Sequence, residues 1–234
     1  MGRRTRGRDA DNRPALERAG DASGGAGGAG GAAGALVERL LDAGIDGRGP
    51  FESAQAVAAS AREKSRSDEA AVNAIVRRHV ATGVAGGFVT GLGGLVTMAV
   101  AVPANVIEFY LTATRMVAAI AVVRGYNLTQ AQIRTAVLLT LVGAEADDVL
   151  HKAGLGAGGR ITDLATRRLP DSALMIVNKA VGFRLVSQLG RGVLSRFGRA
   201  VPVIGGAVGA GLDGYLMTRI AEHARTEFPP LTST

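Results

Sequence analysis

The sequence predicts an all-α protein: a helical bundle with a glycine-rich apolar hairpin. Apolar residues recur at helical spacing along most of the chain, and no segment alternates strictly between apolar and polar residues as a half-buried strand would. Aromatic residues make up only 4% of the chain, tryptophan is absent and there are 34 glycines. A core of such small side chains favours helices that approach each other closely.

The first 34 residues are expected to form a disordered tail. An arginine-rich start, RRTRGR, leads into the Gly/Ala-rich stretch GDASGGAGGAGGAAGAL, which buries too little apolar surface to offset the entropy of ordering. The start lacks the apolar stretch of a signal peptide, so no secretion signal is expected. The predicted organisation is a tail over residues 1–34, a helical domain over 35–228 and a frayed C-terminal tail over 229–234.

The first half of the domain is predicted to contain three helix starts. ALVERLLDAGIDG is a short helix with Leu36, Val37 and Leu40 on its apolar face and a stop near Gly44. A second helix begins near Pro50. A third begins at Ser67, whose acid-rich following turn is typical of a helix N-terminus. This third helix runs into an apolar segment that TGLGG, residues 90–94, is expected to interrupt.

The second half shows the same helical spacing. The pattern resumes after Pro103, and TQAQ, Thr129 to Gln132, matches a capping box ahead of a helix over about residues 130–141. A further helical region begins at Asp171 or Ser172. The last helix is the glycine-rich segment VIGGAVGAGLDGYLMTRIAEHAR.

Residues 80–107 carry no charged side chain, and this run exceeds the roughly 20 residues that span a bilayer. A hairpin that folds back at Pro103 would leave arginines at both of its ends on the cytoplasmic side. Glu108 and Arg115 follow, however, and each would cost roughly 2.5–3.5 kcal/mol in the middle of a span. They share a helix face and could turn toward a protein interior. We therefore expect a membrane-associated bundle whose hairpin enters or lies on the bilayer, rather than two clean spans.

Glycines at a spacing of four predict close helix packing. Such a stripe makes a flat helix face that a second helix can approach. The residues expected to serve in this way are Gly83, Gly87, Gly91, Gly205 and Gly209.

Between Asp171 and Asp213 there are five cations and no acid. Several of them lie along one helix face, with Leu185 and Val186 on the other side, which is the pattern of a helix resting on anionic head groups. The alternative is a surface helix of a soluble bundle with a solvated basic face. The net charge of +7 agrees with an anionic partner. The predicted lipid-facing residues are Lys179, Arg184, Arg191, Arg196 and Arg199.

No motif identifies a catalytic residue or a cofactor. GLGAGG and GAGLDG match G-x-G-x-x-G but follow no predicted strand. Asp147 and His151 are one turn apart and could share a metal ion, although an exposed acidic helix end explains them better, because no second pair of ligands occurs elsewhere in the sequence. His79 and His223 are isolated and expected on polar faces. The absence of cysteine excludes disulfides, and acids dilute the N-terminal arginines, so nucleic acid is not an expected partner.

Two segments resemble the EcsC family. GGFVTGLGGLVTMAVAVPANVIEFYLTATRMVAAIAVVRGYNL is similar to its central block, and VPVIGGAVGAGLDGYLMTRIAEHAR is similar to its second signature. The resemblance covers about residues 51–226. Asn105 stands where the family often has an acid. The positions that match the motifs, and that we take as structural, are Gly87, Thr90, Gly91, Gly93, Gly94, Pro103, Gly125, Pro202, Gly205 and Gly209.

The resemblance implies a helical, membrane-associated bacterial protein whose biochemical activity is undefined. The family is named after a gene beside an ABC transporter, and it supplies no catalytic residues. We therefore expect a non-enzymatic protein at the cytoplasmic face of the cell membrane, accessory to a transport or envelope process, with anionic lipid as a partner and a membrane protein as a second candidate. The alternative is a soluble helical enzyme or metal-binding protein that uses Asp147 and His151.

Overall fold

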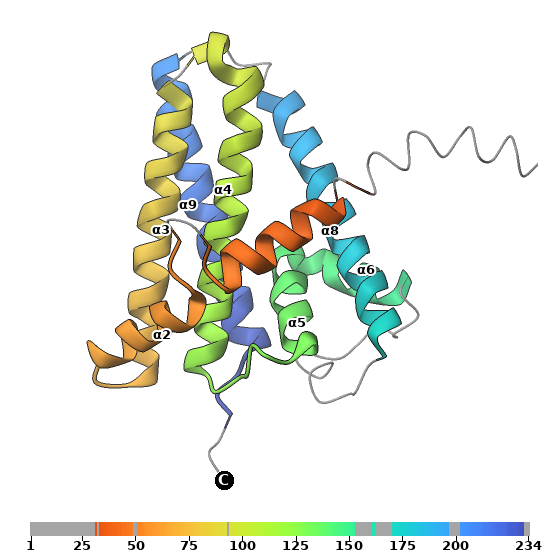
Figure 1. Cartoon of the computed structure of the whole chain (residues 1–234). Helices are drawn as coiled ribbons and strands as arrows, with labels where there is room; N and C mark the ends of the chain where they lie inside the picture. Colours follow the sequence, from red (N-terminus) through yellow and green to blue (C-terminus); the bar gives the residue numbers. More distant parts are fainter. Residues whose placement is uncertain are drawn as a thin grey trace, which may run out of the picture.

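The computed structural model describes residues 31, 33–48, 51–92, 94–152, 161, 170–196 and 202–231. Within these ranges every regular element is a helix, which confirms the predicted all-α class (Figure 1). Residues 1–30 of the predicted disordered tail lie outside the described ranges. Ala33 is buried in a helix over residues 33–39, so helical packing begins before residue 35.

The described elements follow one another along the chain as a series of helices. The helix over 33–39 continues as the π-helix η1 (Leu40–Ile45), followed by α2 (Ala54–Glu63), α3 (Asp68–Leu92) and α4 (Gly94–Val123). Then α5 (Ala131–Val142) leads through the 3-10 helix η2 (Gly143–Glu145) into α6 (Ala146–Lys152). The last two are α8 (Asp171–Arg196) and α9 (Pro202–Glu227).

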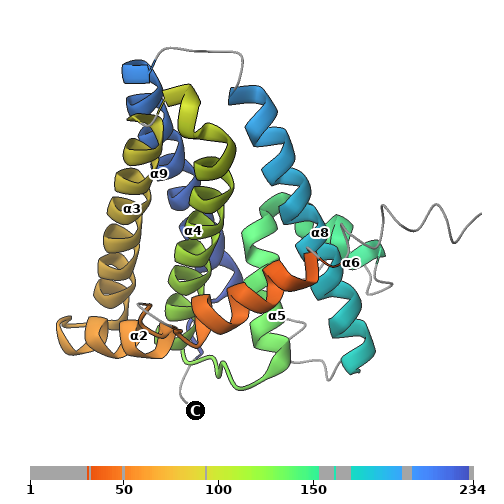
Figure 2. The same cartoon turned by 45° about the horizontal axis from the view of Figure 1, so that its top comes forward.

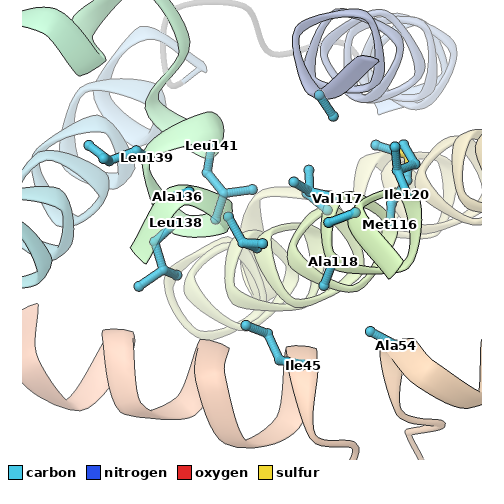
Figure 3. Close-up of a cluster of buried hydrophobic side chains, with 14 of the residues drawn as sticks. Ile45, Ala54, Met116, Val117, Ala118, Ile120, Ala136, Leu138, Leu139 and Leu141 are labelled. Carbon is cyan, nitrogen blue, oxygen red and sulfur yellow. The ribbon is translucent and has the colours of Figure 1, made fainter. Parts of the chain in front are cut away.

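Helix α4 is the centre of the fold. Every residue from 110 to 121 is buried, because η1, α2, α3, α5 and α9 all pack against this helix. Figure 3 shows Val117 of α4 on the side facing Leu141 of α5, and Ala118 of α4 on the side facing Ile45 of η1. Among the described residues, Val106–Val123 is the one helical stretch long and apolar enough to cross a bilayer, and 72% of it is buried inside the protein. Its apolar character is therefore used largely to build the core.

Serine side chains cap two of the helices. The Ser53 Oγ accepts the Ala56 N–H (3.1 Å) at the start of α2, and the Ser67 Oγ accepts the Ala70 N–H (3.2 Å) at the start of α3. The start at Ser67 was predicted, whereas α2 begins later than the predicted start near Pro50. Each cap satisfies a backbone donor that the first helical turn leaves unpaired.

The predicted capping box at Thr129 is wrong. The N-cap of α5 is Gln130, and its side chain makes no capping hydrogen bond. The Thr129 N–H instead donates to Asn127 Oδ1 (2.9 Å). This turn gives the Thr129 backbone N–H a hydrogen-bond partner, and asparagine side chains often accept such a bond from the residue two positions on.

The predicted fold-back at Pro103 is also wrong. Helix α4 runs through Pro103 without interruption, and the chain reverses between Leu92 and Gly94. A proline removes one backbone donor and can be accommodated inside a long helix. Glycine-rich segments permit a chain reversal because glycine adopts non-helical backbone angles at low cost. The break predicted at TGLGG is therefore where the chain turns.

Two other glycines have roles that differ from a simple helix stop. The first helix continues past Gly44, and a Cβ there would lie 2.9 Å from the Thr114 side chain, so Gly44 allows η1 to approach α4. Gly125 has φ +94° just after α4, a conformation that favours glycine. Next to it, the Leu231 N–H donates to the Arg124 carbonyl (2.9 Å), which holds the chain end as far as residue 231.

Helices α3 and α9 are antiparallel and pack along much of their length. Arg225 near the end of α9 pairs with Glu69 near the start of α3 (2.8 Å). Farther along, a Cβ on Gly83 would lie 3.4 Å from Met217 Cε and 3.8 Å from the Asp213 carbonyl oxygen. Gly83 therefore lies at a close helix contact, as its place in the glycine stripe predicted.

Replacing Gly83 with leucine should lower the free energy of unfolding by roughly 1–3 kcal/mol, the usual cost of overpacking. Gly83→Ala should be tolerated, because its Cβ finds ordinary contact distances. The matched control is Gly211→Leu on α9, where nothing lies within 4 Å of an added Cβ. Denaturant unfolding of the three variants tests this, and equal stability of Gly83→Leu and Gly211→Leu would contradict it.

Candidate functional site

Ion pairs gather at one end of the bundle, where α3 starts and α4 and α9 finish. The Glu69 carboxylate of α3 forms ion pairs with Arg124 of α4 (2.6 Å) and with Arg225 of α9 (2.8 Å). Arg62 of α2 pairs with Asp68 (3.1 Å) and also donates to the Val123 carbonyl (2.7 Å). We call this the charged end.

The opposite end carries no charged residue on three of its helices. Figures 1 and 2 both show that the end of α3 and the starts of α4 and α9 lie together there. Residues 80–92 of α3, 94–107 of α4 and 202–212 of α9 include no Asp, Glu, Lys, Arg or His. We call these three segments the charge-free end. The same chain therefore builds a bundle that is polar at one end and apolar at the other.

Exposed apolar side chains mark the border of the charge-free end. They are Val84 on α3 and Leu212, Tyr215 and Leu216 on α9, each between 38% and 61% exposed. Val84 and α9 are in close contact, since a Cβ on Gly214 would lie 2.7 Å from Val84 Cγ2. Large apolar side chains that stay in water on two adjacent helices are typical of an interaction surface.

The C-terminal end of α8 lies near the charge-free end (Figures 1 and 2). The predicted lipid-facing Arg191 and Arg196 belong to the last turns of α8, but their side chains fall outside the described part of the structure, as does Arg199 altogether. Lys179 is exposed near the middle of α8. The prediction for these four cations is therefore neither confirmed nor contradicted.

Arg184 does not have the free basic side chain that was predicted. Its guanidinium pairs with Glu145 of η2, and it lies 3.8 Å from Asp148 of α6. The Glu145 carboxylate raises the pKa of Arg184 above its ordinary value. The two acids connect α8 to η2 and α6 through this cation, so Arg184 is not a free lipid-facing cation.

The outward face of α8 is more apolar than the sequence suggested. Leu185 is buried and Val186 partly buried, as predicted. Met175, Ile176 and Phe183, however, are between 51% and 67% exposed. Met175, Lys179 and Phe183 are spaced by four and share one face.

A charged side chain of α4 lies within the core. Arg115 is 9% exposed, its guanidinium carbon lies 4.7 Å from the centre of the Phe51 ring, and it donates to the Ala43 carbonyl (3.3 Å). Burial lowers the pKa of Arg115. The prediction that Glu108 would share this inward orientation is wrong, because Glu108 is exposed. Ala43 and Phe51 cover Arg115. Glu108, which lies two helical turns nearer the charge-free end, is not covered in this way.

His79 of α3 is buried, which corrects its expected place on a polar face. It is 4% exposed, and Nδ1 lies 2.8 Å from the Ile75 carbonyl, to which it donates. Burial, with a smaller contribution from Arg115 and Arg78, lowers the pKa of His79 from 6.5 to about 4. The spacing of Val72, Ile75 and His79 at three and four residues was the available signal, because it puts all three on one helix face.

Asp147 and His151, the candidate metal ligands, lie one turn apart on α6. Both side chains are exposed on α6, and no group of three or more His, Asp or Glu suited to a metal occurs among the described residues. The neighbouring acids Glu145 and Asp148 face Arg184 instead. This arrangement is an acidic helix end used for an ion pair.

The glycine motifs are helical where the structure describes them. GAGLDG, residues 209–214, lies inside α9 and therefore cannot form a phosphate-binding loop, whereas GLGAGG lies outside the described residues. Pro202 is the first residue of α9, a favoured position for proline. The packing roles of Gly87, Gly91, Gly205 and Gly209 stay predictions, since their surroundings are not described.

The sequence profile of the EcsC protein family matches residues 63–229, which confirms the resemblance drawn from the two motifs. No curated protein and no protein of solved structure matches this chain.

Proposed function

This chain belongs to the EcsC protein family, and we propose that it is a membrane-associated helical protein without enzymatic activity. It would lie at the cytoplasmic face of the cell membrane and act as an accessory to a transport or envelope process. The charge-free end, together with the exposed apolar side chains at its border, is the observation that supports this proposal.

The lipid surface is the partner that best fits this end. A soluble bundle gains nothing from leaving Leu212, Tyr215 and Leu216 in water, and each of these side chains is stabilised when it leaves water for acyl chains. The net charge of +7 adds attraction to anionic head groups. Arg191 and Arg196 are the cations of α8 closest in sequence to the charge-free end.

Changing Arg191 and Arg196 to glutamine should weaken binding to anionic vesicles by roughly 30-fold, because each cation near such a surface contributes about 1 kcal/mol. The matched control is Lys64→Gln with Arg66→Gln, which removes the same charge from exposed positions at the charged end. Vesicle co-sedimentation compares the two. Equal weakening by both pairs would show that only net charge matters.

The apolar face of α8 favours a second binding function. Met175, Ile176 and Phe183 are exposed on the half of α8 away from the charge-free end, so a bilayer that holds that end would not cover them. A membrane protein beside this chain is the partner we propose for this face. Loss of a cross-link to such a partner in Phe183→Ser, with vesicle binding intact, would support it.

Fractionation of expressing cells tests the proposed function directly. We expect the intact chain in the membrane fraction at low salt, and its release by detergent. Recovery of the chain entirely in the soluble fraction at low salt would contradict membrane association.

A further inference from the structure

We infer that the charge-free end inserts into one leaflet of the bilayer and stops there, with α3, α4 and α9 entering the acyl chains side by side. This inference rests on the proposed function. It adds how deep the protein inserts, that it enters from one side of the bilayer only, and that a third helix inserts with the other two. It replaces the two-helix hairpin expected from the sequence, because the first turns of α9 lie with α3 and α4 at the same end (Figures 1 and 2).

Contacts between helices relate the borders of the charge-free segments. On α3 and α9 the borders lie side by side, since a Cβ on Gly214 would lie 2.7 Å from Val84 Cγ2. On α4 the first charged residue counted from the tip is Glu108. Glu69 of α3 pairs with Arg124 of α4 at the far end, so these two helices run antiparallel. All three helices therefore carry their charged residues on the side away from the tip.

The length from this border to the tip matches one leaflet. At 1.5 Å per residue, residues 94–107 of α4 extend about 21 Å and residues 202–212 of α9 about 16 Å. The hydrocarbon core of a bilayer is about 30 Å thick, so a leaflet is about 15 Å. The segments of α4 and α9 are long enough to cross one leaflet and too short to cross two, and residues 84–92 of α3 extend about 14 Å, close to the thickness of one leaflet. Away from the end turns at the tip, their helical backbone also satisfies its own hydrogen bonds, as a lipid environment requires.

The groups at the border suit the head-group region. Tyr215 is 61% exposed on α9, and tyrosine favours the membrane–water interface, where its ring and its hydroxyl meet different surroundings. Glu108 is exposed where the charge-free segment of α4 ends, and the exposed Arg219 follows Tyr215 by one turn on α9. These residues would stop the protein at the depth where charged side chains regain water.

A deeper, spanning arrangement conflicts with the packing of α4. The stretch Val106–Val123 is long enough to span, but most of it is buried against other helices. Arg115 lies inside this stretch, where its guanidinium donates to the Ala43 carbonyl of η1 and packs on the Phe51 ring. Moving the stretch into lipid would strip off the helices that cover it.

The absence of cysteine makes a direct test possible. Single-cysteine variants Leu95→Cys at the tip, Leu212→Cys at the border and Thr226→Cys near the charged end are bound to vesicles of phosphatidylcholine and phosphatidylglycerol. A water-soluble maleimide is supplied either outside the vesicles or sealed inside them. Co-sedimentation of the same samples reports binding, and circular dichroism reports the fold, with Met98→Cys as the replacement if Leu95→Cys does not fold.

We expect vesicles to abolish labelling of Leu95→Cys from both sides, to slow labelling of Leu212→Cys from outside, and to leave Thr226→Cys fully reactive from outside. Labelling of Leu95→Cys from the lumen would mean a span and would overturn the inference. Labelling from outside at the rate of Thr226→Cys, in a sample that still sediments with vesicles, would overturn insertion while membrane association stands. A chain that does not sediment at all would overturn the proposed function as well.

Discussion

Lowering the pH from 6.5 to 4 should reduce the free energy of unfolding by about 3 kcal/mol through the side chain of His79 alone. Burial in the folded protein lowers the pKa of His79 to about 4, against 6.5 when the chain is unfolded. Between these values the unfolded chain binds a proton that the folded chain does not. The contribution of His79 to stability is therefore fully present above pH 6.5 and is lost as the pH falls toward 4.

Denaturant unfolding at a series of pH values measures this effect. His79→Gln should flatten the decline of stability between pH 6.5 and 4, because glutamine does not titrate. Ile75→Val is the matched control: it removes a buried methylene from the same face of α3, costs about 1 kcal/mol at every pH, and should keep the parent's slope. If His79→Gln declines as steeply as the parent, the buried histidine is not the titrating group.

Placing an arginine at the tip of the charge-free end should weaken vesicle binding by roughly a hundredfold. A charged side chain in the middle of a bilayer costs roughly 2.5–3.5 kcal/mol on insertion scales, and each 1.4 kcal/mol is a factor of ten. Leu95→Arg in the first turn of α4 introduces that charge where we infer the deepest insertion. The melting temperature of the variant in solution shows whether the fold survives the change.

Met175→Arg is the matched control for this experiment. It adds the same charge to the same chain, at an exposed position of α8 away from the charge-free end. It should bind anionic vesicles at least as well as the parent. Equal loss of binding in both variants would mean that α8 contacts the membrane as well. No loss of binding in either variant would mean that the charge-free end does not contact the membrane.

The sequence predicted the elements whose signals are local. Ser67 followed by two acids predicts a helix start, and the cap is found there. Leu36, Val37 and Leu40 share a helix face and are buried. The glycines of TGLGG compete with Pro103 as a turn signal, and the proline was the wrong choice because a long helix can tolerate a single missing donor.

Features that depend on contacts between distant residues were not predictable. The ion pair of Arg184 with Glu145 joins residues far apart in the chain. Helical periodicity alone therefore predicted that Arg184 would be an unpaired cation on a basic face. The cover over Arg115 comes from Ala43 and Phe51 on other elements. Residues 80–107 show part of the charge-free end in the sequence. That the start of α9 lies at the same end is seen only in the folded structure.

Co-sedimentation of the intact chain with anionic vesicles tests most directly whether this protein binds a membrane through an apolar end. The structure predicts that the chain pellets with the vesicles at low salt and that a substantial fraction stays bound after a high-salt wash, because salt screens the arginines but not the burial of apolar side chains. A chain that remains in the supernatant at low salt, or that the salt wash releases completely, would contradict insertion of the charge-free end.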